Sequence, residues 1–141
     1  MPPRSPFRKI AKIAQDPLLL TILNGLPVAN PIVDTRLSLL IKGIFSHGII
    51  FNRDGTILSA VTPDGPLSGT VGLSASQFIG EALIKNALCG LGQSTGMNIN
   101  LLGGKDFDIL AYAMNNQLLG ANGIVGVLVL LNPMSLSSLS S

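Results

Sequence analysis

Apolar residues near the start of the chain recur at the spacing of an amphipathic helix. Ser5 followed by Pro6 is typical of an N-cap and a first helical position, and the apolar pattern then continues to residue 14. Pro17 either interrupts this helix or begins another one, because proline cannot donate the backbone hydrogen bond that a helix interior requires. The pattern therefore predicts a helical N-terminal segment with a break near Pro17.

Two later segments also show helical spacing. Asp34 is the expected N-cap of one helix, and Gly48 lies where the apolar stripe of that helix stops. Ser74 and Gln77 have the spacing of a capping box, and apolar residues then follow at helical intervals up to Ala87. We expect a helix in each segment.

Between and after these helices the apolar pattern changes to that of strands. Residues 48–52 and 56–61 flank Asp54-Gly55, a pair that favours a two-residue hairpin turn with both central φ angles positive. Further strands are expected at residues 97–102, 107–114 and 124–131.

The predicted order is helix, helix, strand, strand, helix, strand, strand, strand. Short connections favour antiparallel neighbours, and helices must cover at least one face of the sheet. The sequence therefore predicts an α+β two-layer domain with a five-stranded, mainly antiparallel sheet. The last strand is apolar on both faces, so we expect it at the centre of the sheet.

A length of 141 residues suits one domain. We divide the chain into an N-terminal basic and apolar extension at residues 1–33, a single α+β domain at residues 34–132, and a disordered serine-rich tail at residues 133–141.

The chain has few charges and much apolar character. Charged residues make up 11% of it, against about a quarter in an ordinary soluble domain, and the mean hydropathy is +0.53. After Asn86 the charged residues are Lys105, Asp106 and Asp108. This imbalance predicts that apolar surface is covered by a protein partner, in an obligate oligomer or a larger complex.

Basic residues gather at the N-terminus, where no acidic residue precedes Asp16. Such an arm suits an anionic surface, either a membrane or RNA, and a solvated helix face is the simpler interpretation. Nothing in the sequence indicates DNA binding. The basic residues of this arm are Arg4, Arg8, Lys9 and Lys12.

Few residues are suited to catalysis. His47 and Cys89 are each the single residue of their kind, whereas metal and nucleophile sites need several convergent groups. We expect His47 to bond the last carbonyls of a helix and Cys89 to pack as a small apolar residue. Asp106 and Asp108 would share a strand face, which favours a solvated strand start over a paired-carboxylate site. The sequence predicts no catalytic, cofactor-binding or metal-binding residue, no cofactor, and a protein that is not an enzyme.

The hairpin at residues 48–60 and the two apolar strands at residues 108–114 and 123–130 resemble a group of small scaffold and sensor domains. The group includes roadblock light-chain and profilin-like domains, with GAF, PAS and Cache sensor modules as neighbours. A roadblock resemblance implies dimerisation and a scaffold role, although this chain lacks the closing C-terminal helix of that pattern. The GAF and Cache resemblance implies a small ligand held between sheet and helices.

Three functions follow as hypotheses. The first is a non-catalytic interaction and scaffold module, acting as a subunit of an assembly. The second is a small-molecule-sensing regulatory module, and the third is a structural subunit of a larger particle or filament. The expected interface residues are Phe7, Ile10, Ile13, Leu18, Leu19, Leu20 and Leu23, and the expected ligand-pocket residues are Phe51, Phe78, Tyr112 and Met114.

The sequence shows no convincing membrane-spanning segment and no signal peptide. We therefore expect an intracellular protein, cytoplasmic or organellar, with peripheral membrane attachment through residues 5–24 as a further hypothesis.

Overall fold

The computed structural model describes residues 6–21, 30–52, 54–67, 69–74, 76, 81–88, 91–99, 105–115 and 124–133. Within them the elements are, in chain order, α1 (Pro6–Ala14), α2 (Pro17–Thr21), α3 (Pro31–Ile41), β1 (His47–Asn52), β2 (Ile57–Thr62), β3 (Gly65–Pro66), α4 (Glu81–Leu88), β4 (Leu91–Ile99), β5 (Lys105–Asn115) and β6 (Ile124–Pro133). The predicted helix start at Pro6 and the predicted break near Pro17 are confirmed, since each proline begins a helix.

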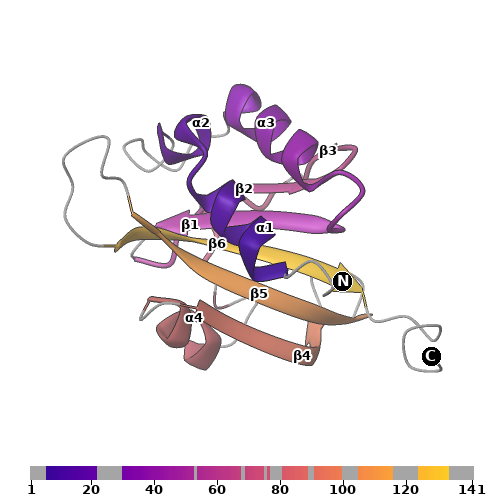
Figure 1. Cartoon of the computed structure of the whole chain (residues 1–141), viewed down its shortest axis with the longest axis vertical. Coiled ribbons are helices and arrows are strands. Elements are labelled where there is room, and N and C mark those ends of the chain that lie inside the picture. The colour runs from indigo at the N-terminus through magenta and orange to yellow at the C-terminus, as the bar shows by residue number, and fades with distance from the viewer. Residues whose placement is uncertain are drawn as a thin grey trace.

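The strands form one antiparallel sheet in the order β3-β2-β1-β6-β5-β4. Because β3 has only two residues, five longer strands carry the sheet. The predicted α+β class with a mainly antiparallel sheet is confirmed. After β3 the chain crosses to the far edge at β4 and then returns, strand by strand, to place β6 beside β1 (Figure 1).

The last strand, β6, is central and buried on both sides, as the sequence predicts. Leu128 and Leu130 belong to one core cluster and Val127 and Val129 to the other, and none of the four is accessible to solvent. A buried Val or Leu side chain stabilises a fold by roughly 1.5–3 kcal/mol. The chain's own helices and neighbouring strands thus cover much of the apolar run for which the sequence predicts a partner.

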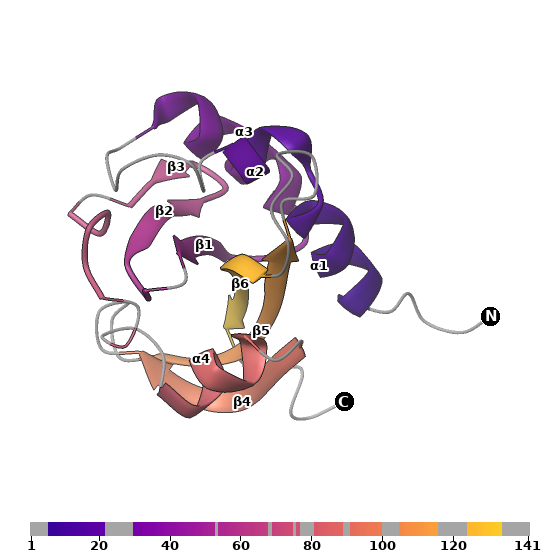
Figure 2. The same cartoon turned by 90° about the vertical axis from the view of Figure 1, so that its left-hand side faces the viewer.

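Helices cover both faces of the sheet. α1 packs against β5 and β6, and α3 packs against β1, β2 and β3, so both lie over the face that carries Leu128. α4 lies over the other face, where Leu83 and Ala87 join the second core cluster. Figure 2 shows α2 at the junction between α1 and α3, with α4 at the opposite side of the sheet. The helix that the sequence predicts before residue 88 therefore lies on the opposite face of the sheet from α1 and α3.

The start and end of α3 differ from the prediction. The N-cap is Asn30, whose side chain accepts hydrogen bonds from Ile32 N and Val33 N at 3.2 Å each, and Pro31 is the first helical residue. Asp34 instead lies buried inside the first turn. The helix ends at Ile41, and the left-handed residue that follows its C-cap is Gly43, with φ of +80°.

Gly48 is not a helix terminator but a residue of β1. A Cβ built at this position would lie 3.3 Å from the Cδ2 and Cγ atoms of Leu37. The absence of a side chain at Gly48 therefore lets α3 approach the sheet closely.

The predicted hairpin between β1 and β2 is confirmed, but its turn is different. The side chain of Asn52 accepts hydrogen bonds from the backbone N–H groups of Asp54 and Thr56, at 3.0 Å each. Gly55 has a φ of +83°, and no non-glycine residue among those described has a positive φ. The turn thus uses one left-handed residue and an asparagine side chain in place of a two-residue turn.

The segment between β3 and β4 also differs from the prediction. Ser74 forms an isolated bridge with Thr56, and α4 spans Glu81–Leu88, so the expected helix is described only from Glu81 onward. β4 spans Leu91–Ile99, whereas the sequence predicts a strand at residues 97–102. Ser5, Gln77, Cys89 and the serine-rich tail after Pro133 lie outside the described residues.

Candidate functional site

A cleft of about 540 Å³ lies between α1 and α3, and we call it the α1–α3 cleft. This volume is within the range of small-molecule sites, roughly 300–1,000 Å³. The cleft opens beside the turn that joins α1 to α2. Its lining residues are Lys9, Lys12, Ile13, Gln15, Asp16, Pro17, Arg36, Leu40 and Ile44.

Asp16 occupies the turn between α1 and α2 and is only 8% exposed. Pro17 begins α2 directly after it, and the carboxylate Oδ2 accepts a hydrogen bond from Leu19 N at 3.3 Å. This is the geometry of an N-cap, in which a side-chain oxygen satisfies a free N–H of the first helical turn. Asp16 therefore fixes the start of α2.

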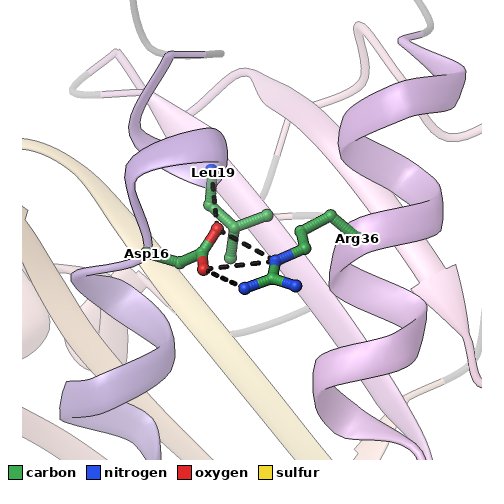
Figure 3. Close-up of polar contacts among 3 residues, drawn as sticks. All are labelled: Asp16, Leu19 and Arg36. Atoms are coloured by element: carbon green, nitrogen blue, oxygen red, sulfur yellow. Dashed lines mark hydrogen bonds and ion pairs between the residues drawn. The ribbon is translucent and has the colours of Figure 1, made fainter.

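Arg36 of α3 reaches the same carboxylate (Figure 3). Its Nη2 donates to Asp16 Oδ1 at 2.7 Å, and its Nε lies 3.2 Å from Oδ1 and 3.3 Å from Oδ2. Two nitrogens of the guanidinium thus hold both carboxylate oxygens, as in the bidentate pairs that arginine forms best. The contact ties the α1–α2 turn to α3.

The ion pair changes the ionisation of both groups. Burial on its own raises the pKa of Asp16, but the hydrogen bonds from Arg36 and Leu19 and the Arg36 charge outweigh it and hold that pKa below its ordinary value of 3.8. The same carboxylate raises the pKa of Arg36. Asp16 is therefore a carboxylate at neutral pH.

Two further cations line the cleft from α1. Lys9 and Lys12 are three residues apart, so they project from one side of the helix. Neither lysine pairs with a carboxylate among the described side chains. Three basic side chains therefore face one acidic side chain, and that acidic side chain is already bound to Arg36. The cleft is positive, with an apolar wall of Ile13, Leu40 and Ile44.

The residues expected to form a ligand pocket do not lie together. In the register of the sheet, Phe51 is opposite Val127 and Tyr112 is opposite Leu128. Because consecutive residues of β6 point to opposite faces, Phe51 and Tyr112 lie on opposite sides of the sheet. Met114 is on the Tyr112 side. Phe78 lies outside the described residues.

Most of the expected interface residues that can be assessed are buried in the chain's own core. Ile10 and Leu19 are fully buried and Ile13 is 5% exposed, because all three pack over the sheet. Leu18 is 36% exposed. Leu23 and the side chains of Phe7 and Leu20 lie outside the described part of the chain, as do Arg4 and the side chain of Arg8.

His47 is not at a helix end but in β1. Its ring packs edge-on against the Phe107 ring, with 5.5 Å between the ring centroids. Its Nδ1 lies 2.8 Å from Ser46 Oγ, and that hydroxyl donates a hydrogen bond to Leu131 O at 3.0 Å. Burial lowers the pKa of His47 below 6.5. This places a neutral histidine among apolar residues of the α4 side of the sheet.

Within the described residues, no three His, Cys, Asp or Glu side chains gather as metal ligands would. Asp106 and Asp108 are both exposed on β5. None of the helices described is long and apolar enough to cross a bilayer.

The sequence did not point to Arg36 at all, and the one signal for Asp16 was its position directly before a proline.

Comparison with solved structures finds similar chains. The sensor domain of Escherichia coli DcuS aligns with a TM-score of 0.66 and 14% sequence identity, over 95% of this chain and 88% of that one. The sensory domain of the Campylobacter jejuni chemoreceptor Tlp3 (CcmL) aligns with a TM-score of 0.48 and 12% identity, over 90% of this chain and 53% of that one. No protein-family model matches the chain, and no curated protein matches it.

The comparison with DcuS corrects the functional interpretation. This chain shares its fold with the DcuS sensor domain, which supports the neighbouring resemblance to Cache-type modules and does not support the roadblock and profilin-like resemblance. The scaffold and complex-assembly hypothesis depended on that resemblance and on uncovered apolar surface. The alignment with the DcuS sensor domain contradicts this hypothesis and favours the alternative hypothesis of a small-molecule-sensing module.

Proposed function

We propose that this protein is a small-molecule-sensing regulatory module. The observation that carries the proposal is the alignment with the DcuS sensor domain over nearly the whole of both chains. A cleft of suitable volume between α1 and α3 adds a place where a ligand could bind. The proposal includes the expectation that the chain is not an enzyme.

A screen of metabolites by thermal unfolding tests the proposal. A ligand that binds the folded chain alone raises its melting temperature in proportion to the logarithm of ligand concentration. We expect at least one compound to give such an increase, with saturable one-to-one binding in calorimetry. If a broad library contains no stabilising compound, the sensing function is wrong.

A sensing module must also transmit the occupancy of its site. We therefore include in the proposal a protein partner or a second copy of the chain that contacts it. Light scattering with and without the bound compound measures the change in assembly.

Cell fractionation tests the intracellular location that the sequence predicts.

A further inference from the structure

We propose that the α1–α3 cleft binds a small organic anion, a carboxylate or a phosphate ester, with an apolar body. This inference rests on the proposed sensing function and adds to it the place and the chemical class of the ligand. Lys9 and Lys12 of α1 and Arg36 of α3 would hold the anionic group. The apolar body would lie against Ile13, Leu40 and Ile44.

The charge balance of the cleft favours an anion. Asp16 is only 8% exposed and is held by two nitrogens of Arg36 and by Leu19 N, so its negative charge is already compensated. Lys9 and Lys12 have no such partner among the described side chains. Clefts lined by one sign of charge concentrate the field and attract the opposite charge.

Arg36 keeps a donor for a ligand. Its Nε and Nη2 bind Asp16, whereas its Nη1 has no hydrogen bond among the described residues. In Figure 3 this second terminal nitrogen points away from the carboxylate. The Arg36 side chain is 44% exposed, so the donor is accessible from the cleft. Asp16 thus orients a guanidinium whose remaining donor can meet an anion.

The apolar wall sets the second half of the ligand's chemistry. Leu40 is partly buried, and Ile44 is 37% exposed although it is a large apolar residue. An inorganic ion would leave this wall in water, whereas an apolar body would cover it. Phenylacetate and phenyl phosphate each combine an anionic group with an apolar ring. Phenylacetamide has the shape of phenylacetate but carries no charge.

Titration of the isotope-labelled full chain with these three probes, followed by NMR at constant ionic strength, tests the inference. We expect phenylacetate and phenyl phosphate to shift the Lys9 and Lys12 amide signals and the Arg36 Nε–H signal. Phenylacetamide should bind about tenfold more weakly or not at all, which corresponds to the loss of one charged hydrogen bond.

Two double variants with the same change in net charge provide the control. K9Q/K12Q removes the two cleft lysines, and K42Q/K85Q removes two exposed lysines that do not line the cleft. We expect K9Q/K12Q to weaken phenylacetate binding about tenfold and K42Q/K85Q to leave it unchanged. Unchanged melting temperatures of both variants show that folding is not the cause.

Several results would overturn the inference. Equal affinities for phenylacetate and phenylacetamide would show that the site does not recognise the negative charge. Equal losses of phenylacetate affinity in K9Q/K12Q and K42Q/K85Q would show that the ligand does not bind in the α1–α3 cleft. NMR signal shifts centred on the face of the sheet that α4 covers, or no shift with any probe, would also contradict binding in the α1–α3 cleft. Binding to phosphatidylglycerol vesicles but not phosphatidylcholine vesicles, lost in K9Q/K12Q and unaccompanied by probe binding, would point to a lipid surface instead.

The failure of the inference is separable from that of the sensing function. A metabolite that stabilises wild type and K9Q/K12Q equally leaves sensing intact and rejects the cleft. Probe binding in the cleft without any stabilising metabolite supports the anion site and rejects sensing.

Discussion

Arg36 and Asp16 are 20 positions apart in the sequence, yet Arg36 Nη2 lies 2.7 Å from Asp16 Oδ1. The carboxylate in turn accepts the Leu19 N–H at the start of α2. One buried side chain therefore caps a helix and fastens the α1–α2 turn to α3 beside the cleft.

Removal of the Asp16 carboxylate should loosen this junction. We expect Asp16→Ala to lower the free energy of unfolding by about 1–2 kcal/mol, because both the cap and the partner of Arg36 are lost. Asp16→Asn keeps an oxygen for the cap and should cost less. Urea unfolding measures both, with the exposed turn residue Asp64→Asn as control. If Asp16→Ala is no less stable than Asp64→Asn, the contacts of Asp16 do not contribute to the free energy of unfolding.

The same carboxylate predicts a pH dependence. The pKa of Asp16 is lower in the folded chain than its ordinary value of 3.8, so protonation favours the unfolded state. Its contribution is fully present above pH 3.8 and is lost as pH falls through the lower folded pKa. The stability difference between wild type and Asp16→Asn should therefore shrink on acidification below pH 3.8. A difference that is constant or grows across this window would contradict the assignment.

His47 should titrate below its ordinary value. Burial lowers its pKa from 6.5, so the folded state binds the proton less well than the unfolded state. Its effect on stability is favourable above pH 6.5 and is lost progressively as pH falls through 6.5 towards the folded pKa. As the single histidine, His47 gives one set of ring signals for an NMR titration. A midpoint at or above 6.5 would show that the ring is not buried as described.

Ser59→Ala should destabilise the contact between α3 and β2. Ser59 is fully buried and its Oγ donates to Asp34 Oδ1 at 2.6 Å. Its loss leaves a buried carboxylate without that donor, which costs about 1–3 kcal/mol. Ser38→Ala, which removes a 2.8 Å bond to Thr62 O across the same contact, should cost about 1 kcal/mol or less. Equal stabilities of the two variants, by chemical unfolding, would refute the ranking.

The sequence predicts the strands better than what surrounds them. Strand positions follow from local alternation and from turn residues such as Gly55, and the central place of β6 follows from its apolar run. The N-cap of α3 was predicted wrongly, because Asn30 and Asp34 are both residue types that cap helices and local sequence does not decide between them.

The candidate site depends on information that no local pattern carries. The pairing of Asp16 with Arg36 requires the packing of α1 and α2 against α3. The faces of Phe51 and Tyr112 depend on how each strand registers with β6, and a shift of one residue exchanges the two sides. Phe51 and Tyr112 were therefore placed in one pocket although the sheet separates them.

The position of β6 has a consequence for biosynthesis. β1 and β2 emerge early from the ribosome, but β6, which joins them to β5 and β4, is the last of the described strands to be made. Until then each half presents an unpaired backbone edge, the kind of surface that promotes association between nascent chains. We therefore expect the pairing of β6 with β1 and β5 to be a long-range folding event that is slow compared with hairpin formation.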